Sequence, residues 1–137
     1  MKEFETYRGT VYPWHCDFNG HMNVMHYVGK FDEATWHFFA HFGITPAYLK
    51  NEDKAMVAAE QHFKYFQELN SGNLIYIKTE LLEFKQKAIV FIHRMYNVER
   101  EALVAEGKMA GVHIDMKSRK PVPFPQNILA QSPNSEI

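Results

Sequence analysis

The chain has very little of several features that define particular classes of protein. Its 137 residues contain a single cysteine, Cys16, which excludes an internal disulfide and makes the cytoplasm the expected compartment. No apolar run approaches the roughly 18 residues that a membrane span needs, and the first ten residues lack the apolar core of a signal peptide. The 15 Lys and Arg residues nearly balance 16 Asp and Glu. Charge therefore gives no reason to expect nucleic acid or a membrane as a partner.

Recognisable metal-binding patterns are also missing, although the chain has eight His residues. His37 and His41 are four residues apart and would share one face of a helix. No HExxH, no CxxC and no third ligand at a regular spacing accompanies them. The stretch from Asp17 begins like a calcium loop, but its twelfth position is Val28, where such a loop needs Glu. We therefore expect no metal site.

Apolar and aromatic residues are plentiful, at 46% and 15% of the chain, which excludes a disordered protein and suits one core. We expect a single domain over residues 1–137. Alternating or apolar patterns predict strands at 4–14, 55–66, 73–84, 87–98 and 102–114, and a surface tail with four Pro at 121–137. Because the separators are short, we expect sequential antiparallel hairpins or a meander.

A long helix is predicted over residues 24–42, because apolar residues recur there at spacings of three and four. Asn23 is a suitable N-cap, and Gly43 is a stop signal. Trp36 would widen the buried surface, and Gly29 would allow close approach of a packed neighbour. The expected fold class is α+β, a five-stranded antiparallel sheet wrapped around one long helix.

The stretch WHCDFNGHMNVMHYV, residues 14–28, places polar residues between the first strand and this helix. Asp17 would lie near the first-turn N–H groups of the helix, which have no partners inside it and carry partial positive charge. Such groups can bind an oxyanion, while a carboxylate attacks a carbonyl or activates water. Gly20 would allow a tight turn. An ordinary turn with a helix cap is the alternative explanation of the same residues.

Residues 17–27, DFNGHMNVMHY, resemble the D-x-x-G-H-x-N-x-x-x-Y signature of hotdog-fold acyl-CoA thioesterases related to 4-hydroxybenzoyl-CoA thioesterase. The resemblance covers roughly residues 4–116, including the early Asp, the long helix and the following strands. It implies the hotdog fold and hydrolysis of a CoA thioester to free acid and CoA, with no cofactor. It also implies a homodimer or homotetramer with sites at the subunit interface.

The resemblance implies roles for individual residues in the motif. Asp17 matches the catalytic carboxylate, which acts as a nucleophile or general base. The N–H of Val24 occupies the position that polarises the thioester carbonyl. The remaining matches are the turn glycine Gly20, the polar pair His21 and Asn23, and the core aromatic Tyr27.

The chain departs from the 4-hydroxybenzoyl branch directly after Asp17. That branch has Pro-Ala where this chain has Phe18 and Asn19, so its substrate is not transferred. Phe18, Asn19 and Tyr27 are candidates for substrate binding. Glu60 and His62 are further candidates that would reach the site across a dimer, with a solvated strand face as the alternative.

Aromatic side chains could also line an acyl pocket for an aromatic group or, through cation–π contacts, for a quaternary ammonium. The candidates are Trp14, Phe18, Trp36, Phe63, Tyr65 and Phe66. Packing in the core is the alternative for each of them. Two other functions stay open at this point: a hotdog enoyl- or hydroxyacyl-CoA hydratase, and a non-catalytic acyl-CoA-binding domain.

Overall fold

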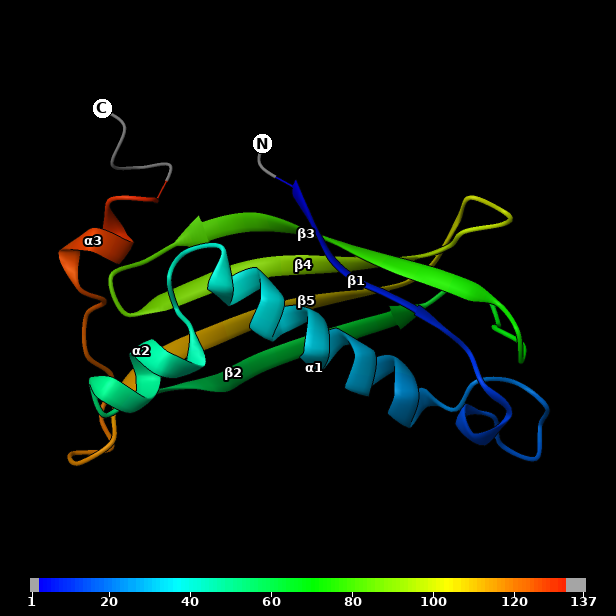
Figure 1. The fold of residues 1–137 in the computed structure, drawn as a ribbon, viewed down its shortest axis with the longest axis horizontal. Helices are drawn as coiled ribbons and strands as arrows, with labels where there is room; N and C mark the ends of the chain where they lie inside the picture. The colour runs from blue at the N-terminus through cyan, green and yellow to red at the C-terminus, as the bar shows by residue number, and fades with distance from the viewer. Residues whose placement is uncertain (1–2, 133–137) are drawn as a thin grey trace.

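The computed structural model describes residues 3–132 and has the predicted order of strands and long helix (Figure 1). The strands are β1 (Glu3–Thr10), β2 (Lys54–Tyr65), β3 (Leu74–Phe84), β4 (Ala88–Asn97) and β5 (Ala102–Asp115). The helices are α1 (Val24–Ala40), α2 (Pro46–Asn51) and α3 (Gln126–Leu129), with a 3₁₀ turn at Pro13–His15. The α+β class and the five strands are confirmed. None of the helices in this part of the chain is long and apolar enough to cross a membrane.

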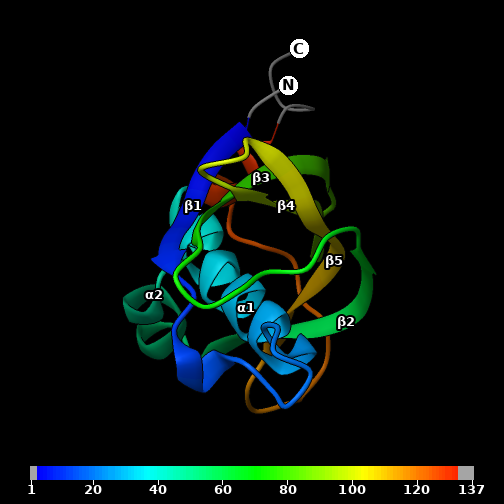
Figure 2. The same ribbon diagram turned by 90° about the vertical axis from the view of Figure 1, so that its right-hand side faces the viewer.

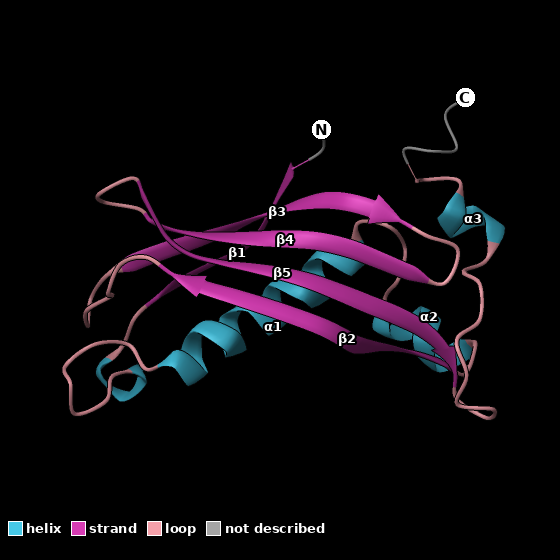
Figure 3. Cartoon of the chain, turned by 180° about the vertical axis from the view of Figure 1, so that it is seen from behind, coloured by secondary structure: helices cyan, strands magenta, loops and turns pink. Residues whose placement is uncertain are grey.

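The sheet is antiparallel throughout, with the strand order β1-β3-β4-β5-β2 (Figure 3). β3, β4 and β5 form the expected meander, but β2 does not pair with β3. It pairs with β5, from Lys54 opposite Asp115 to Tyr65 opposite Ala105. The prediction of sequential pairing is therefore wrong for β2, which forms one edge of the sheet.

β2 does not pair with β3 because residues 66–73 form a crossing segment, which connects β2 at one edge to β3 on the other side of the sheet. In the view toward the N-terminal end of α1, this segment passes in front of the helix (Figure 2). Leu69 is fully buried, and its carbonyl accepts a hydrogen bond of 2.8 Å from the Met22 N–H. The Asn73 carbonyl accepts another, also 2.8 Å, from Val11. The segment is thus a packed crossover, not a hairpin turn.

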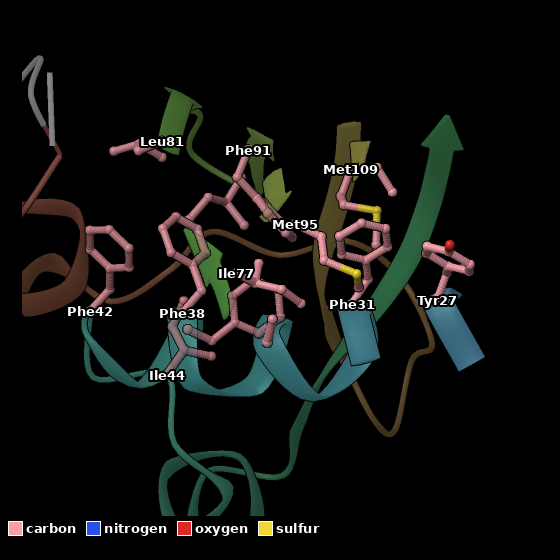
Figure 4. Packing of buried hydrophobic residues seen from close by; sticks show 14 of the residues in the cluster. Tyr27, Phe31, Phe38, Phe42, Ile44, Ile77, Leu81, Phe91, Met95 and Met109 are labelled. Atoms are coloured by element: carbon pink, nitrogen blue, oxygen red, sulfur yellow. The ribbon is translucent and has the colours of Figure 1, made fainter. Parts of the chain in front are cut away.

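The long helix α1 lies in the concave face of the sheet, which arches around it from β1 to β2 (Figure 2). Phe31 and Phe38 are fully buried against strand residues such as Phe91 and Met95 (Figure 4). Burial of each such side chain stabilises the fold by about 1.5–3 kcal/mol. The helix ends as predicted before Gly43, whose φ of 86° is the left-handed conformation that glycine adopts most readily.

Two predictions for α1 are wrong, because one flank of the helix is not covered by the sheet. Trp36 is 40% exposed instead of widening the buried surface, since it lies beside a pocket under β2. A Cβ on Gly29 would meet no atom within 4 Å, so no packed neighbour in the described chain requires the glycine. On another side of the same helix, Lys30 is only 5% exposed, and its Nζ donates to the Tyr7 hydroxyl at 3.1 Å.

A series of hydrogen-bonded polar side chains crosses the core between the helix and the sheet. His93 on β4 is fully buried and hydrogen-bonds Thr35 through Nε2 at 2.8 Å and Thr79 through Nδ1 at 2.6 Å. Thr79 in turn contacts the Thr6 hydroxyl at 2.7 Å. The His93 ring stacks on Phe31, with 5.5 Å between centroids. Burial lowers the pKa of His93 to about 3, so the ring is neutral at pH 7.

The segment after β5 packs on the protein, contrary to the predicted surface tail. Phe124 and Ile128 are 2% and 0% exposed, and they close the end of the core near α2. The buried His113 connects α2 to the segment after β5. Its Nε2 lies 2.9 Å from the Tyr48 hydroxyl in α2, and its Nδ1 lies 2.9 Å from the Val122 carbonyl in that segment. The prediction thus missed two apolar anchors among the prolines. Residues 133–137 of that tail lie outside the described residues.

Candidate active site

Asp17 lies in a tight loop between the 3₁₀ turn and α1. The Gly20 N–H donates to the Asp17 carbonyl at 2.9 Å, and the Asp17 N–H donates to the His21 carbonyl at 3.1 Å. Gly20 has a φ of 87°, which explains why a glycine suits this turn. Phe18 is at the tip with its side chain fully exposed. The sequence thus folds here into a loop that presents one carboxylate.

The Asp17 carboxylate is fixed by hydrogen bonds to both of its oxygens. The Asn19 N–H donates to Oδ1 at 2.9 Å, and the Asn23 side-chain amide donates to Oδ2 at 2.9 Å. These bonds, first that from Asn23 and then that from Asn19, lower the pKa of Asp17 below its ordinary value. The carboxylate is therefore ionised at neutral pH. Each oxygen keeps a second lone pair for another donor.

Asn23 couples this carboxylate to the start of α1. Its Oδ1 accepts a hydrogen bond of 2.9 Å from the Met25 N–H, as the predicted N-cap should. Its backbone N–H donates to the His15 carbonyl at 2.8 Å. One residue thus caps the helix and orients the carboxylate. The Val24 N–H, at the first helical position, is one of those that cannot bond within the helix.

A groove of about 580 Å³ opens beside this helix end, between α1 and the start of the crossing segment. The lining residues are His21, Met22, Val24, Tyr27, Tyr65, Phe66, Gln67, Glu68 and Arg100. The His21 imidazole reaches across it to the Glu68 carboxylate, 2.9 Å away. The Tyr27 hydroxyl donates to the Gln67 carbonyl at 3.2 Å, and burial raises the pKa of Tyr27 to about 12.

The structure brings some of the candidate residues together and separates others. Asp17 and Asn23 share the loop, and His21, Val24 and Tyr27 line the adjacent groove. Glu60 and His62 are elsewhere: both line a hollow with Lys85 and Lys108 on the other face of the sheet. Glu60 also lines the pocket beside Trp36. Within one chain, neither residue belongs to the groove at Val24.

Glu68 is the groove residue that sequence reasoning missed. It comes from the crossing segment, 47 positions after His21, and no local pattern connects the two. Only the knowledge that this segment crosses the helix end would have placed it there. As for metals, residues 3–132 contain no group of three or more His, Cys, Asp or Glu side chains arranged to hold an ion.

Comparison with known proteins gives a consistent family. A sequence profile described as the thioesterase-like superfamily matches residues 11–132. The L-carnitine dehydrogenase/betainyl-CoA thioesterase of Ruegeria pomeroyi is 31% identical over 111 residues, which are 80% of this chain and 22% of that protein. This chain thus spans about a fifth of that relative. The betainyl-CoA thioesterase of Pseudomonas aeruginosa is 25% identical over 92% of this chain and 79% of its own length.

The fold is also shared with solved structures. A hypothetical protein from Staphylococcus aureus, solved in complex with CoA, superposes with a TM-score of 0.88 at 19% identity. The match covers 96% of this chain and 83% of the other. At that identity the likeness shows the fold, including the arched sheet around α1.

Proposed function

Because this chain belongs to the thioesterase-like superfamily, we propose that it hydrolyses an acyl-CoA thioester to the free acid and CoA. The observation that carries the proposal is the double role of Asn23. Its side chain holds the Asp17 carboxylate at 2.9 Å and caps the helix whose first N–H groups point outward. An ionised carboxylate and an oxyanion site are thereby fixed relative to each other, as attack on a thioester carbonyl requires.

In the proposed reaction, the carbonyl oxygen of the thioester accepts a hydrogen bond from the Val24 N–H. Asp17 then acts in one of two ways: as a general base that takes a proton from water, or as a nucleophile that forms an acyl anhydride. In the first, hydroxide adds to the carbonyl and the tetrahedral intermediate expels CoA thiolate, which gains a proton. In the second, an oxygen of the Asp17 carboxylate adds to the carbonyl and CoA thiolate leaves and gains a proton; water then hydrolyses the anhydride to the free acid and the Asp17 carboxylate. Both need only residues of the protein and water, with no cofactor.

The neighbouring residues have supporting roles in this proposal. Gly20 shapes the turn, and His21 lines the acyl-CoA groove with its ring held by Glu68. Asn19 fixes the second carboxylate oxygen, while Tyr27 anchors the first turns of α1 in the core.

We further propose that the chain works as a homodimer or homotetramer. Strand β2 is an edge strand with no fully buried residue, and it exposes apolar side chains such as Val57, at 41%. An exposed edge of 12 residues favours pairing with another strand. Pairing of two β2 edges would bring Glu60 and His62 toward a second copy, and the loop-tip residue Phe18 would be free to contact its substrate. Sedimentation at micromolar concentration tests this assembly.

The chemistry is tested by release of CoA from a panel of acyl-CoA substrates, measured with a thiol reagent. Asp17→Asn should lose at least a hundredfold in kcat, because an amide is neither base nor nucleophile. The matched control is Asp53→Asn, an exposed acid in the turn before β2, which should keep full activity. Undiminished turnover by Asp17→Asn would refute the mechanism. A change in enoyl absorbance without thiol release would instead indicate the hydratase reaction.

A further inference from the structure

The two walls of the groove beside α1 are joined by side chains as well as by backbone. The His21 Nε2 lies 2.9 Å from the Glu68 Oε2, and the next residues of the two walls share the hydrogen bond from the Met22 N–H to the Leu69 carbonyl. Because a carboxylate only accepts hydrogen bonds, Nε2 carries a proton. The imidazole is thus held at a fixed point on the crossing segment.

This ion pair is too exposed to matter much for stability. The side chains of His21 and Glu68 are 36% and 71% exposed, and pairs of that kind contribute little to the free energy of unfolding. Any larger effect of Glu68 is therefore expected at the candidate active site, where its partner His21 belongs to the same loop as Asp17.

Within that loop, Asp17 lies directly opposite His21. Cys16 and Met22 form an antiparallel bridge, and one step inward the same register pairs Asp17 with His21, whose carbonyl accepts the Asp17 N–H at 3.1 Å. Opposite residues of such a pair have Cβ atoms about 4.5–5.5 Å apart. After the hydrogen bonds, first that from Asn23, the charge of His21 also lowers the pKa of Asp17. The imidazole therefore has two carboxylates within reach.

The Asp17 carboxylate needs its remaining lone pairs for the proposed reaction. One of them takes a proton from water or adds to the thioester carbonyl. In residues 3–132 the carboxylate accepts hydrogen bonds from Asn19 and Asn23, whereas the His21 Nε2 faces Glu68. If His21 instead donated to Asp17, it would occupy a third lone pair and make the carboxylate less basic and less nucleophilic.

We propose that Glu68 is a positioning residue for Asp17: it holds the His21 imidazole on the opposite wall of the groove and so keeps the reactive carboxylate free of a competing donor. The inference rests on the proposed thioesterase function and gives a role to a residue far from the sequence motif. Arg100 supports Glu68 from the turn before β5, because its Nη2 donates to the Glu68 carbonyl at 3.5 Å. Glu68 acts through His21 and not by contact with the reacting atoms.

The test is a cycle of four proteins assayed for CoA release: the parent, Glu68→Ala, His21→Ala and the double variant. In Glu68→Ala the imidazole is free to donate to Asp17, so kcat should fall about tenfold, the effect of one hydrogen bond to a charged group, with a smaller change in KM. Without His21 there is no competing donor. The double variant should therefore have the kcat of His21→Ala and be more active than Glu68→Ala. A double variant no more active than Glu68→Ala, or a parent kcat in Glu68→Ala, would overturn the proposal.

Two controls separate positioning from a structural role. Glu99→Ala removes an exposed acid in the turn before β5 that does not line the groove, and it should keep the parent kcat. The midpoint of urea unfolding should be the same for Glu68→Ala as for the parent. If kcat fell only in proportion to a loss of folded protein, Glu68 would be structural and the proposal would be wrong.

The position of the ring is also measured without any turnover, so that a failure of the proposed function can be told apart. The pKa of the Asp17 carboxyl is followed by ¹³C NMR in the same four proteins. Loss of the Glu68 charge alone lowers this pKa slightly, and a new hydrogen bond from the imidazole lowers it further. The fall caused by Glu68→Ala should therefore be larger with His21 present than in the His21→Ala background. Equal falls in the two backgrounds would overturn the proposal, even in a protein that cleaves no thioester.

Discussion

The buried His93 makes a quantitative prediction for the dependence of stability on pH. Burial lowers its pKa from 6.5 to about 3, whereas in the unfolded chain the imidazole titrates near its ordinary value. Between these values the unfolded state binds more protons, so the free energy of unfolding falls as the pH falls. The stabilising effect is complete above the ordinary pKa and is lost progressively toward pH 3.

The size of this fall in the free energy of unfolding follows from the two pKa values of His93. Between pH 7 and pH 5 the unfolded imidazole becomes almost fully protonated while the folded one stays neutral, which costs about 2 kcal/mol of stability. The hydrogen bonds to Thr35 and Thr79 give the neutral ring both of its partners. A protonated ring would have to donate at both nitrogens inside a core that also contains Phe31.

The assay is urea unfolding at pH 7 and pH 5, at one protein concentration, for the parent and for His93→Gln. The variant should be less stable at pH 7, because it loses a buried hydrogen bond and ring packing. The difference between the two pH values, however, should shrink by about 2 kcal/mol. His37→Gln, on an exposed part of α1, is the control and should keep the parent difference. The reasoning would be refuted if His93→Gln kept the full difference in free energy of unfolding between pH 7 and pH 5. It would also be refuted if NMR showed the His93 imidazole of the folded protein becoming protonated between pH 7 and pH 5.

Three further predictions concern the loop, the reaction and the end of the chain. Asn23→Ala should cost about 1 kcal/mol of stability through the lost cap and should also reduce kcat, whereas Thr45→Ala, which removes the cap of α2, should change only stability. Equal kcat values for the two variants would show that Asn23 has no role in the reaction. Since the pKa of Asp17 is lowered from 3.8, kcat/KM should show no acidic limb due to this group between pH 7 and 5, and a limb near 6.5 would point to a histidine instead. Phe124→Ala should cost about 3 kcal/mol or more, measured by urea unfolding, against less than about 0.5 kcal/mol for the exposed Phe18→Ala; similar values would contradict the packing of the C-terminal segment.

Local pattern was enough to predict most of the elements. The spacing of apolar residues located α1, and Asn23 and Gly43 marked its ends, because helix formation and capping depend on neighbours within a few residues. The position of β2 in the sheet could not be found this way. It depends on contacts between residues 40 to 61 positions apart, from Tyr65 with Ala105 to Lys54 with Asp115, which no short window contains.

The same distinction applies to the candidate site. Its loop was predicted because Asp17, Gly20 and Asn23 are close together in the sequence, and the resemblance depended on that spacing. The opposite wall of the groove was not predicted, because Glu68 arrives through the crossing segment. Trp36 was expected to widen the buried surface of the helix, but the helical pattern has no information on where the sheet ends.

The crossing segment also has a consequence for how the protein folds. The meander of β3, β4 and β5 needs only short loops, whereas β2 can join β5, and residues 66–73 can pass over α1, only after long loops have closed. We expect the groove to be assembled late, since its two walls meet only when the Met22 N–H reaches the Leu69 carbonyl. In native-state hydrogen exchange, that amide would then report the opening of the groove ahead of global unfolding. A ligand that spans the two walls would slow its exchange, so occupancy of the groove and closure of the chain around α1 become one measurable event.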